Sequence, residues 1–393
     1  MIRHTTRRAA LLGAAAGLSA CAMPVRQPAV PRGDTFRASV LGIPNERFVG
    51  AGIAAGMTAE SNAAIARRRR HLGLPDSAEL PMDLLAISGG GENGAFGAGL
   101  ITAWADRPEF FLVTGVSTGA LSAPFAFIGP AGDAGLRRVY NDVTLADILV
   151  QRSLLAAVFD DALVDTSPLF RTISRELDDA MLAAIAQGYR EGRLLLVGTT
   201  NLDAQTPVIW NIGAIAASGH PRAPETIRRV LLASAAIPGA FPPVLFDVEV
   251  DGQRFQELHV DGGAVAQAFL YPTAVAQRRR DAIRAGRRVP PVRAWLVRNA
   301  RMDADWASTE RRTYSIAGRA VQTMIAASGY NDSVRTWLNA ERDGVEFRMS
   351  WIGEGFTVPY ERPFDPAYMR PLFAYGQQRM REGTAWVRQP PFT

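Results

Sequence analysis

Residues 84–119 read LLAISGGGENGAFGAGLITAWADRPEFFLVTGVSTG, and this stretch decides the fold. It contains two short apolar runs, at 84–88 and 110–114, and each is followed by glycines and then by a helix-like segment, at 94–105 and 119–128. Short apolar runs bounded by turn residues indicate buried strands. The stretch therefore predicts a strand–turn–helix unit that occurs twice in succession.

A glycine motif leaves the end of each predicted strand. The second motif, at 115–119, has Ser117 between Gly115 and Gly119, the G-x-S-x-G pattern of an exposed nucleophile on a tight strand-to-helix turn. The first motif, at 89–94, offers backbone amides for an oxyanion hole; its candidate residues are Gly89, Gly90, Gly91, Asn93 and Gly94. Because a right-handed crossover puts the carboxyl ends of successive parallel strands on one edge, we expect both motifs to meet there.

A serine nucleophile needs a base, and the sequence offers two kinds. In α/β-hydrolases the histidine comes late in the chain, but here no histidine follows His259. A triad with His220 or His259 stays possible, although no motif supports it. The better candidate is Asp261, because it follows a predicted strand at 257–260 and precedes two glycines, which lets its carboxylate reach the same sheet edge.

Four blocks of the sequence resemble the patatin-like phospholipase family. They are residues 89–94, 115–119, 233–243 and 260–263, and they occur in the family's order. Since this family uses a Ser–Asp dyad without histidine, the resemblance implies Ser117 as nucleophile and Asp261 as base. It also implies a lipid acyl-ester substrate, hydrolysis of the phospholipase A or lysophospholipase type and an acyl-serine intermediate.

One position departs from the family pattern. The family commonly has a basic residue where this sequence has Asn93. The backbone donors survive this change, but Asn93 supplies no positive charge. A non-catalytic lipid-binding protein therefore stays open as a second hypothesis.

Further strands are predicted at 194–199, 257–260 and 292–297, separated by helical or loop segments. This alternation predicts an α/β fold. The resemblance implies a three-layer α/β/α sandwich with a mostly parallel central sheet and helices on both faces. We predict these parts: a signal peptide (1–20), a lipidated, proline-rich tether (21–45), an amino-terminal helical segment (46–81), a catalytic core (82–300) and a carboxyl-terminal helical extension packed on the core (301–393).

The amino terminus predicts export. Basic residues precede a short apolar segment at 9–20, which is typical of a secretory signal peptide. The segment ends in Leu-Ser-Ala before Cys21, and this resembles the lipobox of bacterial lipoproteins, so we expect lipidation of Cys21 and attachment to a membrane in the cell envelope, at the outer membrane or the periplasmic face. An ordinary signal peptide with a coincidental cysteine would fit the same residues. Arg7 and Arg8 leave both general and twin-arginine export open.

The sequence also argues against several other classes of function. It contains no lysine, which excludes a Walker A nucleotide site and a Schiff-base lysine. Gly89, Gly91 and Gly94 also fit a dinucleotide fingerprint, but Glu109 precedes the second strand, whereas a ribose-binding acid would follow it. We expect no cofactor, no metal ion, and neither nucleotide nor nucleic acid as a partner. Four consecutive arginines at 67–70 fit a solvated helix end or a contact with anionic lipid.

Overall fold

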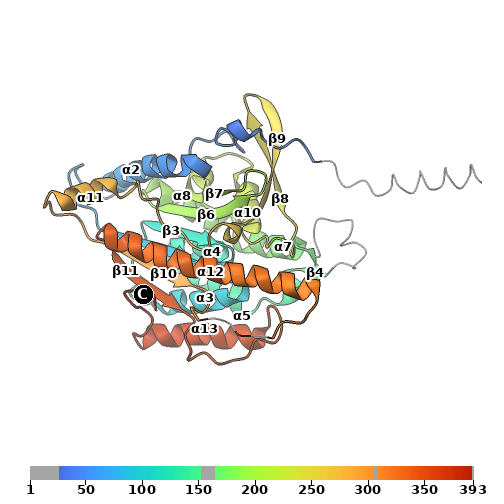
Figure 1. Cartoon of the computed structure of the whole chain (residues 1–393). Helices are drawn as coiled ribbons and strands as arrows, with labels where there is room; N and C mark the ends of the chain where they lie inside the picture. The colour runs from blue at the N-terminus through green and yellow to red at the C-terminus, as the bar shows by residue number, and fades with distance from the viewer. Residues whose placement is uncertain (1–25, 152–163, 304–305, 307, 392–393) are drawn as a thin grey trace, which may run out of the picture.

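The protein is built around one large mixed sheet. The structure is a computed structural model that describes residues 26–151, 164–303, 306 and 308–391. Within these residues the sheet has nine strands, and its centre is a parallel set in the order β6-β3-β2-β10-β11 (Figure 1). Antiparallel strands complete it: β7 and then β1 extend the β6 side, while β9 pairs with the end of β6 and carries β8.

The strand bounds are as follows: β1 (Arg47–Val49), β2 (Met82–Ile87), β3 (Leu112–Val116), β6 (Leu194–Asn201), β7 (Thr206–Asn211), β8 (Val244–Val250), β9 (Gln253–Asp261), β10 (Val292–Arg298) and β11 (Glu346–Trp351). A separate pair is formed by β4 (Val150–Gln151) and β5 (Val164–Asp165).

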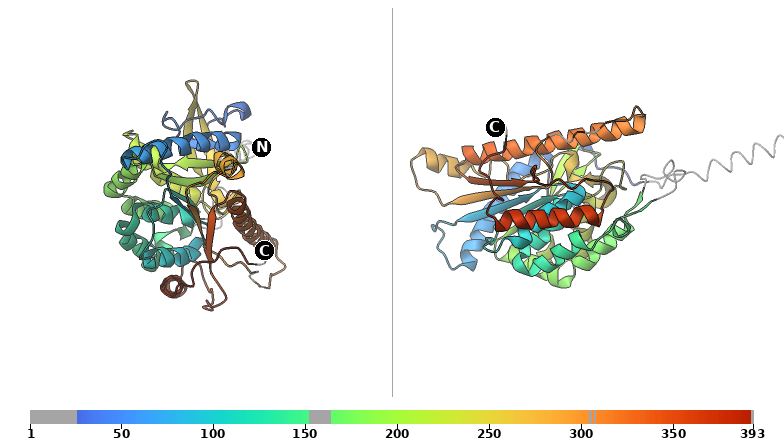
Figure 2. Two further views of the ribbon diagram at one scale, coloured as in Figure 1. Left: turned by 90° about the vertical axis from the view of Figure 1, so that its left-hand side faces the viewer. Right: turned by 90° about the horizontal axis from the view of Figure 1, so that it is seen from below.

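Helices cover both faces of the sheet, as Figure 2 shows. One face carries α3 (Gly94–Ala103), α4 (Thr118–Ile128), α5 (Asp133–Asn141), α7 (Ser167–Glu176), α8 (Asp179–Arg190), α9 (Ile212–Ala217), α10 (Ala223–Ser234) and α13 (Pro366–Arg381). The other face carries α2 (Ile53–His71) and α12 (Thr313–Arg342). The short α11 (Gln277–Arg284) precedes β10.

The apolar runs of the sequence explain why the central strands are buried on both sides. In β2, Leu85 and Ile87 pack among the helices of the first face, whereas Leu84 and Ala86 pack on the second. Side chains alternate between faces along a strand, so a strand covered on both faces must be apolar throughout. The expected α/β/α architecture is confirmed.

The predicted strands and helices are present with small shifts, but several strands were not predicted. β11 belongs to the central sheet although it lies in the part predicted as a helical extension. β1 likewise lies in the predicted helical segment and pairs with β7. These strands are short and have charged or polar residues among the apolar ones, so periodicity did not reveal them.

Two predictions for the amino-terminal part need revision. Residues 26–45, the described part of the predicted tether, lie against the β8–β9 hairpin through contacts such as Ser39 with Glu249 and the Pro28 carbonyl with the Gln256 amide.

The arginine run at 67–70 forms the end of α2, and most of its side chains bind groups of the chain itself. Arg67 binds Glu60, Arg68 binds Glu109, and Arg69 donates to the Ala78 carbonyl. Of the two alternatives predicted for residues 67–70, the structure favours the helix end over the contact with anionic lipid. Cys21 and the signal peptide lie outside the described residues.

No helix within the described ranges is long and apolar enough to cross a membrane.

Candidate active site

Ser117 lies in a strained turn between β3 and α4. Its φ angle is +56°, a region that side chains other than glycine rarely adopt. The turn is tight because a Cβ on Gly119 would overlap the Ile87 carbonyl oxygen, and one on Gly115 would lie 2.5 Å from the Gly119 oxygen. Strain of this kind persists only where neighbouring structure enforces it, and it clusters at functional sites. The strand–turn–helix geometry predicted for Ser117 is thus present.

The amide of Ser117 is held by a residue that the sequence analysis did not single out. Ser117 N donates to Ser234 Oγ over 3.0 Å, and Ser234 Oγ donates to the Gly198 carbonyl over 2.7 Å. Ser234 is fully buried at the end of α10, inside the block 233–243 that the family resemblance contains. This serine fixes the turn to β6 and occupies the Ser117 amide.

Asp261 lies beside Ser117 at the end of β9. β9 pairs with β6 so that Asp261 is opposite Thr199, and its carboxyl lies close enough to the Ser117 hydroxyl for that hydroxyl to lower its pKa. Gly263 N donates to Asp261 Oδ1 over 2.7 Å. Burial raises the pKa of Asp261 to about 6, and the Ser117 hydroxyl and the hydrogen bond from Gly263 offset only part of that rise.

The glycine loop 89–94 lies directly against the serine. A Cβ on Gly89 would be 3.2 Å from Ser117 Cβ. The Gly89 amide donates to the Gln267 carbonyl, the Asn93 amide to Gly90 O, and the Gly94 amide to Gly91 O and Glu92 O. Within the described chain, the amides of Gly90 and Gly91 have no partner. Of the loop residues predicted to donate to an oxyanion, Gly90 and Gly91 are therefore the ones whose backbone amides are available in this conformation.

The side-chain oxygen of Asn93 is engaged by the carboxyl-terminal part of the chain. The Tyr368 hydroxyl, from α13, donates to Asn93 Oδ1 over 2.7 Å. The position at which the family commonly has a basic residue is thus used to fasten the loop to the carboxyl-terminal helix. Nothing in the sequence pattern pointed to Tyr368.

Gln267 is a second residue that the sequence analysis missed. Its carbonyl accepts from Gly89, its side chain donates to Gly263 O over 3.0 Å, and its own amide donates to Asp332 Oδ2 over 2.6 Å. Gln267 therefore connects the glycine loop, the Asp261 turn and α12.

His259 is not placed to act as the base. It is fully buried, with Nδ1 at 2.9 Å from Thr199 Oγ1 and Nε2 at 3.0 Å from Glu257 Oε2. Since the ionised Glu257 carboxylate can only accept, the hydrogen of the neutral ring is on Nε2, and Nδ1 then accepts from the Thr199 hydroxyl. Burial lowers the pKa of His259, which keeps the ring neutral. Both nitrogens are occupied away from Ser117.

His220 and Glu109 also lack the geometry that a catalytic base and a ribose-binding acid require. His220 is partly exposed, and its Nδ1 accepts from the Arg222 amide. Glu109 pairs with Arg68 and Arg193 ahead of β3, so it is not at the strand end where a ribose would bind. Among the residues in the described ranges, no group of three or more His, Cys, Asp or Glu side chains could hold a metal ion.

A comparison with protein families agrees with this geometry. The family model described as Patatin-like phospholipase matches residues 85–274, a range that contains the glycine loop, Ser117, Ser234 and Asp261.

The chain carries a patatin-like phospholipase domain.

This family consists of lipid acyl hydrolases. No curated protein matches the chain closely enough to suggest a narrower function.

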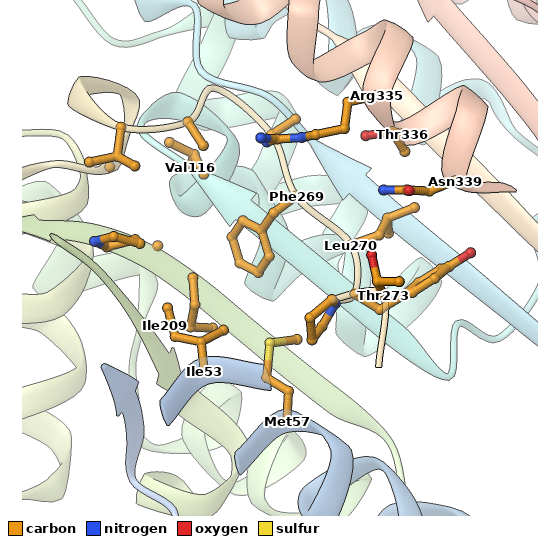
Figure 3. Close-up of a pocket in the computed structure, with 18 of the residues that line it drawn as sticks. Ile53, Met57, Val116, Ile209, Phe269, Leu270, Thr273, Arg335, Thr336 and Asn339 are labelled. Atoms are coloured by element: carbon orange, nitrogen blue, oxygen red, sulfur yellow. The ribbon is translucent and has the colours of Figure 1, made fainter. Parts of the chain in front are cut away.

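Two cavities lie near the catalytic edge of this patatin-like domain. The larger, of about 410 Å³, is on the α2 and α12 side of the sheet (Figure 3). Its lining includes Met57, Phe269 and Arg335, and it reaches Val116 and Gly262, the neighbours of the two site residues, but neither Ser117 nor Asp261 lines it. The lining of the smaller cavity described next also contains neither Ser117 nor Asp261.

The smaller cavity lies on the nucleophile's side of the sheet. It is an apolar slot of about 50 Å³. Its lining includes Gly91, a member of the glycine loop, and Thr118, the residue after Ser117. Leu121 and Phe125 of α4 form one wall, and Leu169 of α7 is on another. Among the aromatic residues near the site, Phe125 lines this slot, Phe269 lines the larger cavity, and Phe127 and Phe241 are buried in the core.

Proposed function

We propose that this protein hydrolyses acyl esters of membrane lipids, in the manner of a phospholipase A or lysophospholipase, through a Ser117–Asp261 dyad. The observation that carries the proposal is the position of the buried Asp261 carboxyl beside the Ser117 hydroxyl, with a pKa that burial raises to about 6 and that the hydroxyl lowers in part. A carboxylate with a pKa near 6 is ionised at neutral pH and is a stronger base than an exposed aspartate.

In the acylation step, Ser117 Oγ attacks the ester carbonyl carbon while its proton passes to the Asp261 carboxylate. The carbonyl oxygen becomes an oxyanion, for which the free amides of Gly90 and Gly91 are the donors. When the tetrahedral intermediate collapses, the bond to the leaving alcohol breaks and Asp261 returns the proton to that oxygen. Ser117 then carries the acyl group as an ester.

In the deacylation step, water attacks the acyl-serine and gives a proton to Asp261. Collapse of the second tetrahedral intermediate releases the fatty acid and returns the proton to Ser117 Oγ. The apolar slot beside Thr118 and Leu121 is our candidate for the carbons of the acyl chain nearest the ester, because its lining includes the residue after Ser117 and its wall is mainly apolar.

The test is hydrolysis of phospholipid, lysophospholipid and p-nitrophenyl esters by the wild type and two variants. We expect Ser117→Ala and Asp261→Asn each to lower kcat/KM by about 10³-fold or more, since residues of such a unit are strongly interdependent. Circular dichroism controls for folding. A serine-directed fluorophosphonate should label the wild type and not Ser117→Ala. An unlabelled wild type, under conditions that label a known serine esterase, would favour a non-catalytic lipid-binding protein.

We propose further that Cys21 is lipidated after export and attaches the enzyme to a membrane of the cell envelope. The support is the lipobox-like sequence Leu-Ser-Ala-Cys that ends at Cys21. Mass spectrometry of the amino-terminal peptide should find acyl groups on Cys21. Cys21→Ser should remove these acyl groups and let a high-salt, alkaline wash release the protein from membranes, whereas the acylated wild type should resist that wash. Equal resistance of the two proteins would contradict the anchor.

A further inference from the structure

The first half of α12 carries its apolar side chains on the outside. Ile316 is 53% exposed, Val321 47% and Met324 71%. By contrast, Ser315 and Arg319 are only half-exposed. With about 3.6 residues per turn, Ser315 and Arg319 lie on the side of the helix opposite Met324, so at the start of α12 the polar side is the less exposed one. Gln322, further along on that polar side, is exposed. An ordinary surface helix has the reverse arrangement.

This exposed apolar face needs an explanation. Single apolar residues on a surface are common, but a contiguous set marks a surface that binds something. Ile316, Ala320 and Met324 follow one another at four-residue spacing, and Val321 and Ile325 form a second row beside them. All five are exposed. We call them the outer face of α12.

The outer face belongs to a helix that is joined to the active site. α12 meets the catalytic loops one turn after Ile325: Gly329 packs against Arg298 and Gln267, and Asp332 accepts from the Gln267 amide. Gln267 in turn contacts the glycine loop and the Asp261 turn. From this junction the first half of α12 projects beyond the sheet (Figures 1 and 2).

The net charge around the outer face is positive. From Glu310 to Asn331 the sequence has three arginines, Arg311, Arg312 and Arg319, and one acidic residue, Glu310, which pairs with Arg312. An amphipathic helix with arginines and a row of apolar residues is typical of segments that lie in the interface of anionic membranes.

We propose that the outer face of α12 docks on an anionic lipid surface and brings the catalytic edge to the lipids. The apolar side chains enter the boundary between headgroups and acyl chains, and Arg311, just before the start of the helix, binds the phosphates. The choice of a lipid surface rests on the proposed function, since the substrate of a lipid acyl hydrolase is found there. This docking would act independently of any lipid on Cys21.

The test is flotation of the full chain with vesicles of phosphatidylcholine alone and of phosphatidylcholine mixed with phosphatidylglycerol. All proteins carry Cys21→Ser so that acylation cannot contribute. We expect flotation with the anionic vesicles, and a loss of affinity of about tenfold in Met324→Asp, because an apolar contact is replaced by a charge. Gln322→Asp is the matched control: it adds the same charge two residues away, off the outer face, and should bind nearly as the parent does.

Activity on a soluble short-chain ester separates docking from catalysis. Met324→Asp should keep this activity and lose hydrolysis of vesicle phospholipid, while Ser117→Ala should float normally and hydrolyse neither substrate. Equal weakening by Met324→Asp and Gln322→Asp, or a parent that does not float, would overturn the proposal. So would a dimer that Met324→Asp dissociates without any change in flotation. Flotation without ester hydrolysis by any form would keep the docking and overturn the hydrolase proposal.

Discussion

At the scale of single residues, Asp261 makes the clearest prediction. Its pKa is raised to about 6, so kcat/KM for a soluble ester should rise with pH through a midpoint of about 6 and level off above it. The physical reason is that only the ionised carboxylate can take the Ser117 proton. A pH–rate profile measures this directly. A midpoint near 4, the range of an exposed aspartate, would contradict the burial argument.

The raised pKa of Asp261 also affects the free energy of unfolding. Because folding raises the pKa of Asp261 from 3.8, the folded state binds this proton more tightly than the unfolded state does, and ionisation costs stability as the pH rises from about 4 to about 6. Asp261→Asn removes that cost, and its amide oxygen can still accept from Gly263. We expect the variant to be more stable by about 2 kcal/mol at neutral pH.

Urea denaturation of both proteins checks this expectation. The difference should shrink towards zero near pH 4, where Asp261 is protonated in the folded protein and partly protonated in the unfolded chain. A variant that is less stable at neutral pH would show that the carboxylate contributes more through its hydrogen bonds than its burial costs.

Leu121 should control acyl-chain length. It lies one turn after Ser117, with its amide bonded to the Ser117 carbonyl, and its side chain forms part of the apolar slot. Leu121→Trp fills a slot of only about 50 Å³. We expect kcat/KM for long-chain p-nitrophenyl esters to fall by about tenfold relative to the acetate ester. The acetate rate of the same variant is the control, and an equal loss for all chain lengths would place the chain elsewhere.

At the scale of elements, a buried ionic chain joins β1 to β9. Arg47 Nη1 lies 2.5 Å from Glu257 Oε2, and His259 Nε2 donates to the same oxygen. Burial raises the pKa of Glu257, but His259 and Arg47 outweigh burial and lower it to about 2. Its stabilisation is therefore present above about pH 4.5 and is lost as the pH falls towards 2.

Glu257→Gln should destabilise the protein by about 3 kcal/mol at neutral pH, because it leaves the Arg47 charge buried without its partner. Chemical denaturation measures the change in the free energy of unfolding. Glu249→Gln, at an exposed position of β8, is the matched control and should change stability little. Equal effects in the two variants would mean that the buried pair adds nothing.

Some elements could be predicted from sequence and others could not, for physical reasons. β2 and β3 are apolar throughout because they are covered on both faces, and their glycine turns identify the serine and the loop. β1, β7 and β11 mix apolar with charged or polar residues, and β11 lies beyond the matched family region. Ser234, Gln267 and Tyr368 act through tertiary hydrogen bonds over long sequence separations, and no local pattern carries such information.

At the scale of the whole molecule, the carboxyl-terminal part completes the core. β11 pairs with β10 along its full length, and Gly376 of α13 packs against the Phe96 carbonyl of α3. Removing residues 344–393 would expose an apolar edge strand and uncover α3. We expect an aggregated or non-cooperatively unfolding product, measured by soluble yield and thermal circular dichroism. A soluble fragment with a sharp transition would show that residues 344–393 are dispensable.

The position of Arg26, the first described residue, bears on how the enzyme would meet its lipid substrate. Arg26 binds Asp203, just after β6 ends, at the edge of the sheet that also carries Ser117. From Cys21 to Arg26 the extended chain spans at most about 17 Å. If Cys21 is acylated, this short linker keeps Ser117 close to the bilayer. Substrate would then be found by lateral diffusion in two dimensions, and turnover would depend on its surface density rather than on its bulk concentration.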